Sequence, residues 1–408
     1  MFTVEGKYNT AHVYQKEENV ESSCIFQIRT LMNQPFVAGE SIRIMADCHT
    51  GKGVCIGYTQ TLHSRKVCPS LVGVDIGCGV LVARLGKTIG DFDSLDDVIR
   101  KNVPSSTSIH KEPTVDMDFS AYRCADALVE RDRLVRSAGT LGGGNHFIEI
   151  DTDEEGNYYL AVHTGSRNLG AQIADYYQNR AYENLKDRKV FPVDYKDVLD
   201  TCRAQGRENE IGKILTQLKA ECAEKPVLFR EYAYLEGDGF DDYINDMKLA
   251  QEYAENNRRT IAAIILEKWL GKSIGDCEFF ETIHNYIDTD SMILRKGSVE
   301  AKKGQELIIP INMAVGSIIG EGKSCAEMNY SAPHGAGRLM TRTAAKKDIS
   351  LDDFRNSMKG IYSTCVSRAT LDESPQAYKK LEDITPHIED TVDVKKIIRP
   401  VYNFKAPE

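Results

Sequence analysis

Six short segments of this 408-residue chain combine metal-ligand side chains with neighbouring glycines or small residues, and they are spread between residues 45 and 338. Adjacent side chains within one segment could not complete a metal site, so the fold must bring distant loops together in one pocket. A site assembled in this way is usually catalytic rather than a structural clip. The segments are MADCHTGKG (45–53), VDIGCG (74–79), GGGNHFIE (142–149), HTGSR (163–167), HN (284–285) and HGAGR (334–338).

The composition is that of a globular protein, with 41% hydrophobic and 27% charged residues. No apolar run approaches the roughly 18 to 20 residues that span a bilayer. The first residues are polar and acidic where a signal peptide carries an apolar core, and the 11 cysteines form no CxxC pair. We therefore expect a cytoplasmic protein with free thiols.

The formal net charge of −10 argues against a protein that coats nucleic acid non-specifically, because such binding depends on neutralising phosphates. A local basic groove remains compatible with this charge. One candidate groove contains Arg338, Arg342, Lys346 and Lys347.

Local sequence pattern predicts an α+β chain. From about Ile42 to Val82, the short apolar runs SIRIM, GVCIGY, LVGVDI and GVLVARL alternate with glycine-containing turns and predict strands of a mainly β core. The segment YRCADALVERDRLVRSAG (122–139) predicts a helix that Gly139 ends. The following GGGNHFIEI and YYLAVHTGSR segments each predict a strand next to a turn.

From Asp194 to about Leu270 the chain is charged, and we predict a helical insertion there. Its long helix begins at a cap formed by Asp241 or Asp242, carries an apolar stripe that faces the core, and ends before Gly271. The last third predicts a hairpin-rich segment, RKGSVEAKKGQELIIPINM (295–313), and a helix that opens in TRTAAKK (341–347).

Cys78 and Asp75, on the glycine-flanked turn VDIGCG, are the first candidate metal ligands. One thiolate sulfur can bridge two cations while a carboxylate adds a hard oxygen. A lone cysteine is more often packing, and a lone histidine more often a hydrogen-bonded core residue. Three further histidines, His146, His163 and His284, favour the metal-binding interpretation. Together with Asp75 and Cys78 they supply enough ligands for two ions that share the sulfur. Ligand softness alone favours zinc or cobalt over manganese.

His334 is the candidate nucleophile. It lies among small residues, and Arg338 follows one helical turn later, so an imidazole nitrogen could reach a phosphate while the guanidinium neutralises charge. The alternative interpretation is that His334 lies at the start of a helix and only caps it. Neither HGAGR nor GGGNH matches a Walker A loop or a dinucleotide-binding glycine fingerprint.

Taken together and in this order, the motifs resemble those of the RtcB family of GTP-dependent RNA ligases. The resemblance runs from about Ile42 to Lys405 and includes RKG (295–297), the Pro-x-Ala-Tyr-Lys stretch in SPQAYK (374–379) and a lysine near the C-terminus. It implies a single α+β catalytic domain over residues 1–408 with the family's own fold. In that fold a mainly β core carries the metal site, and the helical insertion lies at about 194–270.

The resemblance also implies a two-manganese site in a deep cleft, with Asp75, Cys78 and His146 holding one Mn²⁺ and Cys78, His163 and His284 holding the other. It makes His334 the residue that accepts GMP. Besides His146 and His284, the residues that it implies for nucleotide binding are Asn145, Glu149, Asn285, Pro310, Asn312, Met313, Ser317, Gly335, Ala336, Gly337, Tyr378 and Lys405. We expect Arg167 and Arg338 to bind RNA phosphates.

The activity implied is the GTP- and Mn²⁺-dependent joining of RNA 3′-phosphate or 2′,3′-cyclic phosphate ends to 5′-hydroxyl ends through a covalent histidine-GMP intermediate. RNA repair and tRNA splicing are both compatible roles. Two other hypotheses use some of the same residues: a dinuclear phosphodiesterase or phosphatase that opens cyclic phosphate ends without ligation, and a non-catalytic sensor of RNA ends. The sequence does not specify the RNA, the oligomeric state or an activating protein partner.

Two features depart from the family. PINM (310–313) stands where the family has Pro-Gly-Ser-Met, so Ile311 replaces a glycine and Asn312 replaces a serine. Ile311 lacks the backbone freedom of glycine, whereas the Asn312 amide can still hydrogen-bond a phosphate. Residues before Ile42 also match the family poorly. We therefore interpret the chain as a divergent paralogue, a repair enzyme for nuclease-cut RNA rather than the housekeeping tRNA-splicing ligase.

Overall fold

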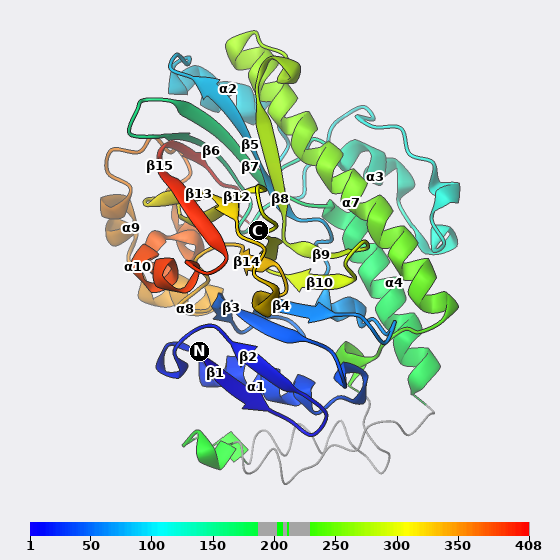
Figure 1. Cartoon of the computed structure of the whole chain (residues 1–408). Helices are drawn as coiled ribbons and strands as arrows, with labels where there is room; N and C mark the ends of the chain where they lie inside the picture. Colours follow the sequence, from blue (N-terminus) through cyan, green and yellow to red (C-terminus); the bar gives the residue numbers. More distant parts are fainter. Residues whose placement is uncertain (187–201, 207–209, 212–228, 408) are drawn as a thin grey trace.

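Two sheets and the helices around them form the α+β fold of this computed structural model (Figure 1), as the sequence predicted. The structure describes residues 1–186, 202–206, 210–211 and 229–407. Within these residues the larger sheet has seven strands in the order β12-β13-β15-β6-β7-β5-β8, each antiparallel to its neighbours. The strands are β5 (Gly79–Gly86), β6 (Phe147–Thr152), β7 (Tyr158–Thr164), β8 (Phe279–Ile283), β12 (Glu306–Asn312), β13 (Gly316–Gly322) and β15 (Val392–Phe404).

The smaller sheet has six described strands in the order β1-β2-β3-β4-β10-β9, with β2 and β3 parallel and the other pairs antiparallel. A two-stranded ribbon joins β11 (Ser298–Glu300) to β14 (Ser331–Pro333). The edge strands β8 and β12 of the larger sheet contact each other, so that sheet curves towards a barrel. The strands of the smaller sheet are β1 (Phe2–Glu5), β2 (Thr10–Val13), β3 (Ile42–His49), β4 (Ile56–Thr61), β9 (Asn285–Asp288) and β10 (Ile293–Lys296).

Alternation along the strands of the larger sheet places apolar side chains on both of its faces, because successive strand side chains point to opposite faces of a sheet. Ile148 and Ile150 of β6 pack on the outer face with Ile261 and Ile265, whereas Phe147 packs on the inner face. The inner face therefore encloses the centre of the curved sheet, with Val80, Val82, Tyr159, Ala161, Ile308, Ile319 and Ile398 around Phe147.

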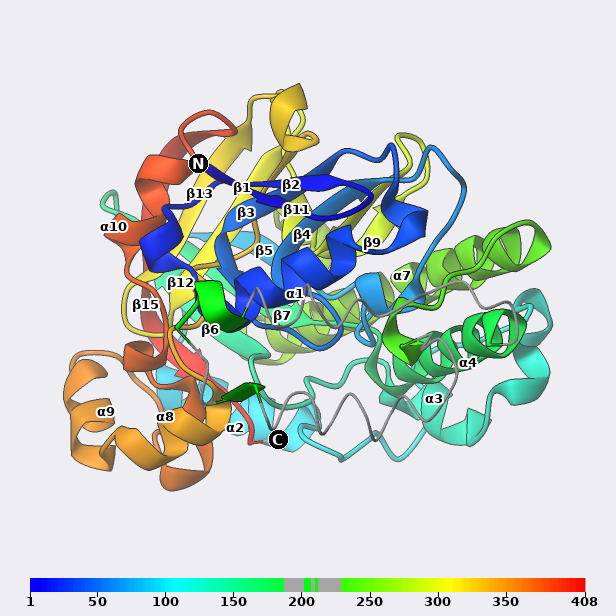
Figure 2. The same cartoon turned by 90° about the horizontal axis from the view of Figure 1, so that it is seen from below.

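Helices cover the outer face of the larger sheet (Figure 2). The long helix α7 (Asp238–Ile265) contacts β5, β7 and two other helices, α2 (Phe92–Asn102) and α4 (Arg167–Leu185). The remaining helices are α1 (Ser22–Met32), α3 (Arg131–Ser137), α8 (Arg342–Asp348), α9 (Leu351–Ser357) and α10 (Leu381–Ile384). No helix in the described ranges is long and apolar enough to cross a membrane.

The strand predictions for residues 42–82 are confirmed for SIRIM, GVCIGY and GVLVARL, which form β3, β4 and β5. The prediction of a strand at LVGVDI is wrong. That segment starts at the last residue of a short 3-10 helix (Pro69–Leu71) and then turns, with Gly73 inside it and Gly77 directly after it at positive φ. These glycines allow a left-handed backbone that an extended strand does not use.

The helix predictions are confirmed in part. The helix predicted over 122–139 is much shorter, because α3 spans only Arg131–Ser137 and Gly139 follows it at a φ of 76°. The stripe of α7 packs in the core and Gly271 ends the segment, but the predicted aspartate cap is wrong, because Gly237 occupies the N-cap. Helix α8 starts as predicted, with the Thr341 hydroxyl accepting a hydrogen bond from the backbone of Ala344.

The predicted insertion at about 194–270 is described only in part. Its C-terminal half contains α7, which packs directly against the larger sheet rather than lying apart from it. Residues 194–201, 207–209 and 212–228 of this prediction lie outside the described residues.

Candidate active site

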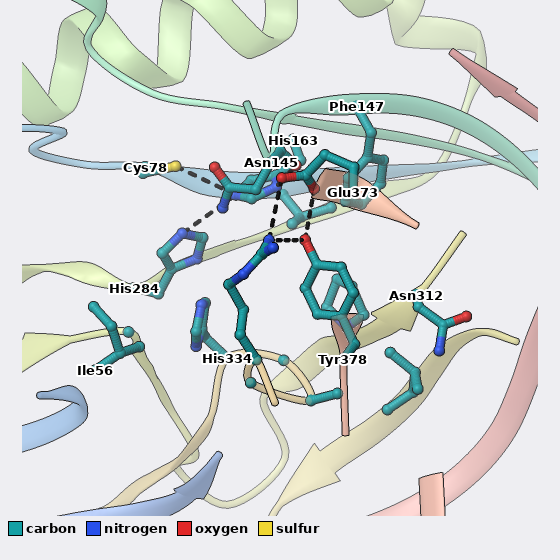
Figure 3. Close-up of a pocket in the computed structure, with 18 of the residues that line it drawn as sticks. Ile56, Cys78, Asn145, Phe147, His163, His284, Asn312, His334, Glu373 and Tyr378 are labelled. Atoms are coloured by element: carbon teal, nitrogen blue, oxygen red, sulfur yellow. Dashed lines mark hydrogen bonds and ion pairs between the residues drawn. The ribbon is translucent and has the colours of Figure 1, made fainter. Parts of the chain in front are cut away.

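The predicted motifs converge on one cavity of about 340 Å³ beside the inner face of the larger sheet (Figure 3). Val80 and Phe147 of that face line it together with the segment around His334. The predicted residues that line it begin with Asp75, Cys78, Asn145, Glu149, His163 and His284. The cavity is also lined by predicted residues from the later part of the chain, namely Asn285, Pro310, Asn312, Met313, Gly335, Ala336, Gly337, Arg338, Tyr378 and Lys405.

The thiol of Cys78 lies among the predicted imidazole ligands. Its Sγ is 3.3 Å from Nε2 of His163 and 3.5 Å from Nε2 of His146. Nε2 of His163 is also 3.3 Å from Nε2 of His284, and Nε2 of His146 is 2.9 Å from Oδ2 of Asp75. The five predicted ligands therefore form one continuous cluster, although their sequence positions span more than half of the chain.

Backbone carbonyls orient two of these imidazoles. Nδ1 of His146 lies 2.9 Å from the carbonyl oxygen of Leu141, and Nδ1 of His163 lies 3.2 Å from that of Asn145. A carbonyl oxygen only accepts, so each Nδ1 carries a proton, and Nε2 of each ring is the nitrogen turned towards Cys78. Metal-binding histidines are commonly oriented in this way.

Glycines and a buried arginine hold the loop of Cys78 in place. Gly77 has a φ of 69°, and a Cβ there would lie 2.9 Å from the Cα of Gln251 in α7. Arg258, also in α7, donates to the carbonyl oxygens of Gly77 at 2.7 Å and Thr164 at 3.2 Å. The arginine therefore joins the loop that carries Cys78 to the end of the strand that carries His163, a role that the sequence analysis missed.

The donor set fits a cation. Burial lowers the pKa of His163 and of His284 well below the ordinary value, so both imidazoles are neutral, as ligands must be. Burial and the charge of Asp75 raise the pKa of the Cys78 thiol, which a bound cation would deprotonate. The candidate ligand atoms of Cys78, His146 and His163 all lie within 4.8 Å of one another, close enough to share an ion.

His334 lies beside this cluster, with its ring centroid 4.7 Å from that of His284. Oδ2 of Asp47 is 2.7 Å from Nδ1 of His334 and also accepts a hydrogen bond from the His334 backbone at 3.2 Å. Asp47 is fully buried on β3. The aspartate therefore fixes the proton on Nδ1 and leaves the lone pair of His334 on Nε2.

Asp47 is itself held by its strand. Lys379 donates to the carbonyl oxygens of Ala46 at 3.2 Å and Cys48 at 2.8 Å, on either side of the aspartate. Sequence reasoning selected the MADCHTGKG segment but missed Asp47 as a functional residue, because its partner is 287 residues away in the chain. No local spacing signals such a pair.

A second missed residue is Glu373, which lies against the side of the cavity opposite the thiol (Figure 3). Its carboxylate accepts from Tyr378 at 2.5 Å, Lys405 at 3.0 Å and Arg338 at 3.3 Å, and Arg342 also pairs with it. Burial alone would raise the pKa of Glu373, but Lys405, Arg342 and the Tyr378 hydroxyl outweigh this effect and lower the pKa to about 2. One buried carboxylate thus organises the cations of this wall.

Replacing Glu373 with Gln should lower the free energy of unfolding by about 3 kcal/mol, because buried cations lose their counter-charge. The native pKa of Glu373 is depressed, so its contribution is present above about pH 4.5 and is lost as the pH falls towards about 2. Urea unfolding across this range should show a smaller acid-induced loss in Glu373→Gln than in the wild type. The exposed residue Glu389 provides the matched control, Glu389→Gln, and equal acid sensitivity of both variants would contradict this assignment.

The basic cluster predicted at Arg338, Arg342, Lys346 and Lys347 is partly neutralised. Arg342 pairs with Asp372 at 2.7 Å as well as with Glu373, and Lys346 lies 3.4 Å from Asp372. Arg338 lines the cavity and stacks on the Tyr378 ring, with its guanidinium carbon 5.0 Å from the ring centroid. These arginines face the cavity wall rather than forming an open basic groove.

The PINM segment forms the end of β12. Ile311 is 2% exposed within the core and has no positive φ, so this strand does not require the glycine of the family pattern. The Asn312 side-chain oxygen accepts from the backbone of Ala314 and Val315, both at 3.0 Å. Only the Asn312 side-chain nitrogen therefore remains available to a phosphate.

Three predicted residues lie outside the lining of the cavity. His146 is in the ligand cluster behind Cys78. Ser317, on β13 opposite Pro310, is buried, and its hydroxyl has no hydrogen-bond partner among the described residues. Arg167 donates to the Thr140 hydroxyl at 3.2 Å and the Ser106 carbonyl at 3.1 Å, so its guanidinium is held by protein groups.

Comparison with known proteins identifies one family over most of the chain. A family model described as tRNA-splicing ligase RtcB matches residues 27–406. The RNA-splicing ligase RtcB1 of Escherichia coli strain ATCC 25922 is 28% identical over 433 aligned positions, covering 97% of each chain. The tRNA-splicing ligase RtcB of Nanoarchaeum equitans is 25% identical, covering 98% of this chain and 96% of that protein. The RNA-splicing ligase RtcB homolog 1 of Entamoeba histolytica is 24% identical, covering 94% and 82%.

Proposed function

This chain belongs to the RtcB family, and from that premise we propose that it is a GTP-dependent RNA ligase. It would join a 3′-phosphate or 2′,3′-cyclic phosphate end to a 5′-hydroxyl end through a covalent guanylate on His334. The observation that carries this proposal is a histidine whose Nδ1 is engaged by the buried Asp47, beside a Cys78 and histidine cluster in the same cavity. We also propose that the chain acts as one catalytic domain.

In the first step, Nε2 of His334 attacks the α-phosphorus of GTP, a P–N bond forms and pyrophosphate leaves. Asp47 stabilises the positive charge that this attack places on the imidazole. In the second step, an RNA 3′-phosphate oxygen attacks the phosphorus of the guanylate. The P–N bond to His334 breaks, and GMP is transferred to the RNA end. A 2′,3′-cyclic end must first be opened by water to expose that phosphate.

In the last step, the 5′-hydroxyl oxygen of the second RNA end attacks the activated 3′-phosphorus, a phosphodiester forms and GMP leaves. Asp75, Cys78 and His146 would hold one Mn²⁺ and Cys78, His163 and His284 a second. Bound there, the ions would offset the negative charge that builds on the phosphoryl oxygens. The Cys78 thiolate and the Asp75 carboxylate would supply the negative charge for binding these cations.

The wall opposite the thiol is suited to the nucleotide. Tyr378 offers an aromatic face for the guanine, and Lys405 and Arg338 offer charge. We further propose Asn145, Glu149, Asn285, Pro310, Asn312, Met313, Ser317 and the Gly335, Ala336 and Gly337 backbone as nucleotide contacts. Arg338, and Arg167 after a rearrangement of its present hydrogen bonds, would contact RNA phosphates.

The direct test is to incubate the protein with α-labelled GTP and Mn²⁺, and then with RNA that carries a 3′-phosphate and a 5′-hydroxyl end. Label should first appear on the protein and then leave it as a joined strand forms. Supplying tRNA halves and nicked ribosomal RNA in parallel would identify the preferred role, for which we propose RNA repair. Absence of both protein label and joined product would contradict the proposal.

Replacing Asp47 with Asn should slow guanylation by about 100-fold to 10⁴-fold while the protein stays folded, because the amide can hold the wrong imidazole tautomer. The rate of label incorporation at saturating GTP measures this effect. The matched control is Asp353→Asn, at an exposed acid on α9. A rate for Asp47→Asn within a factor of about three of the wild type would show that Asp47 does not orient the nucleophile.

A further inference from the structure

Three acidic residues occupy alternate positions along β6 and just past its end. Glu149, Asp151 and Asp153 are only 3%, 0% and 8% exposed, and they continue the inward face that begins with Phe147. Glu149 lines the cavity, whereas Asp151 lies one step further from it along the strand. The three acids therefore share an environment that is closed to solvent, but their hydrogen-bond partners differ.

Glu149 and Asp153 each have donors. The Asn403 side-chain nitrogen, directly across from Glu149 on β15, donates to it. Asp153 accepts from the Tyr159 hydroxyl at 2.7 Å and from Lys396 at 2.9 Å. Both carboxylates are thus stabilised as ions by groups on the neighbouring strands.

Asp151 has none of this support. Neither of its carboxyl oxygens has a hydrogen-bond partner among the described residues. Its cross-strand neighbours are Pro400 on β15, which has no side-chain donor, and Tyr159 on β7, whose hydroxyl is engaged by Asp153. A carboxylate ion with no counter-charge in such a place costs several kcal/mol, so the group keeps its proton instead.

The electrostatics of the pair agree with this assignment. Burial raises the pKa of Asp151 well above the ordinary value, and the charge of Glu149 raises it further. Burial also raises the pKa of Glu149, but Lys405 and the Asn403 amide oppose the increase, and the value is about 7. The pKa of Asp151 is raised further than that of Glu149, because the Asn403 amide and the Lys405 cation act only on Glu149.

We propose, resting on the function proposed above, that Glu149 and Asp151 form a carboxyl pair with one negative charge, which Asn403 and Lys405 fix on Glu149 while Asp151 holds the proton. Glu149 then presents only lone pairs to the cavity. Asn403 is therefore a positioning residue, because its side-chain nitrogen holds the charge on Glu149 at the wall of the cavity.

The proton assignment can be tested without any nucleotide. Infrared difference spectra of the free protein at about pH 8 should contain the C=O band of a buried, protonated carboxylic acid. Asp151→Asn should remove this band, because the amide replaces the neutral acid at nearly the same size, and the matched control Asp153→Asn should leave it. Persistence of the band in Asp151→Asn, or its absence from the wild type, would overturn the carboxyl pair.

The second measurement is the binding of GTP as a function of pH. If Asn403→Ala raises the pKa of Glu149 by about one unit, GTP should bind about fivefold more weakly at about pH 7 and within about 1.5-fold of the wild type at about pH 8.5. Asp151→Asn should bind within about twofold of the wild type at both values, since the replaced group is already neutral.

A loss of affinity in Asn403→Ala that does not recover at the higher pH would show a merely structural role for the asparagine and would overturn its part in the proposal. A wild type that binds no GTP at any pH would contradict the proposed function. The infrared result decides the carboxyl pair in either case, so the two failures are distinguishable.

Discussion

Replacing His334 with Ala is expected to abolish both protein labelling by α-labelled GTP and RNA joining, with a rate loss on the order of 10⁴-fold or more. In the proposed mechanism, Nε2 of His334 forms the bond to the α-phosphorus of GTP, and an alanine side chain offers no such nitrogen. The loss should appear in kcat, because the nucleotide contacts on the opposite wall are untouched. Binding of GTP, measured separately at equilibrium, should therefore stay within about tenfold of the wild type.

The exposed residue His63 provides the matched control, because His63→Ala removes an imidazole outside the cavity. It should label and ligate at the wild-type rate. Label that persists on His334→Ala would show that another side chain forms the covalent intermediate, and the assignment of the nucleophile would fail.

Cys78→Ala is expected to reduce the bound metal and to lower joining by at least about 100-fold. The sulfur is within 3.5 Å of both His146 and His163, so its loss removes the ligand that the two proposed ion sites share. Elemental analysis of protein purified without chelator measures the metal content and also identifies the cation. Ligand softness favours zinc or cobalt, whereas the proposed function uses manganese, and the metal content distinguishes these expectations.

Cys277→Ala is the matched control, since that thiol is also buried but packs in the outer core. It should keep the wild-type metal content. If Cys78→Ala binds as much metal as Cys277→Ala and ligates at the same rate, the sulfur does not bridge the ions and the site must be reassigned.

The ligand cluster could be predicted from sequence because its residue types are unusual beside glycines. Each of its cysteine and histidine residues lies at a strand end or in a turn where small neighbours leave room for a ligand: Cys78, His146, His163 and His284. This pattern can be recognised in the sequence without knowing the fold. Their convergence required the family resemblance, since no spacing rule joins residue 78 to residue 284. The α+β class followed from the alternating apolar runs that became β3, β4 and β5.

Asp47, Glu373 and Asp151 could not be selected from sequence for a common reason. Asp47 and Glu373 act through hydrogen-bond partners that are distant in the sequence, and Asp151 is defined by having no partner among the described residues. The sequence does not indicate which acidic residues become buried. The LVGVDI segment failed for a different reason, because its apolar residues serve a glycine-containing turn that positions Cys78 rather than a strand. Apolar content alone does not separate these two structures.

The measurement that tests the central claim most directly is peptide mapping by mass spectrometry after incubation with GTP and Mn²⁺. The account predicts a single guanylate adduct on the peptide that contains His334, formed by the wild type and not by Cys78→Ala, because the nucleophile and the ligand cluster act in one cavity. An adduct on a lysine such as Lys405, or equal modification of His334 in the Cys78→Ala protein, would contradict it.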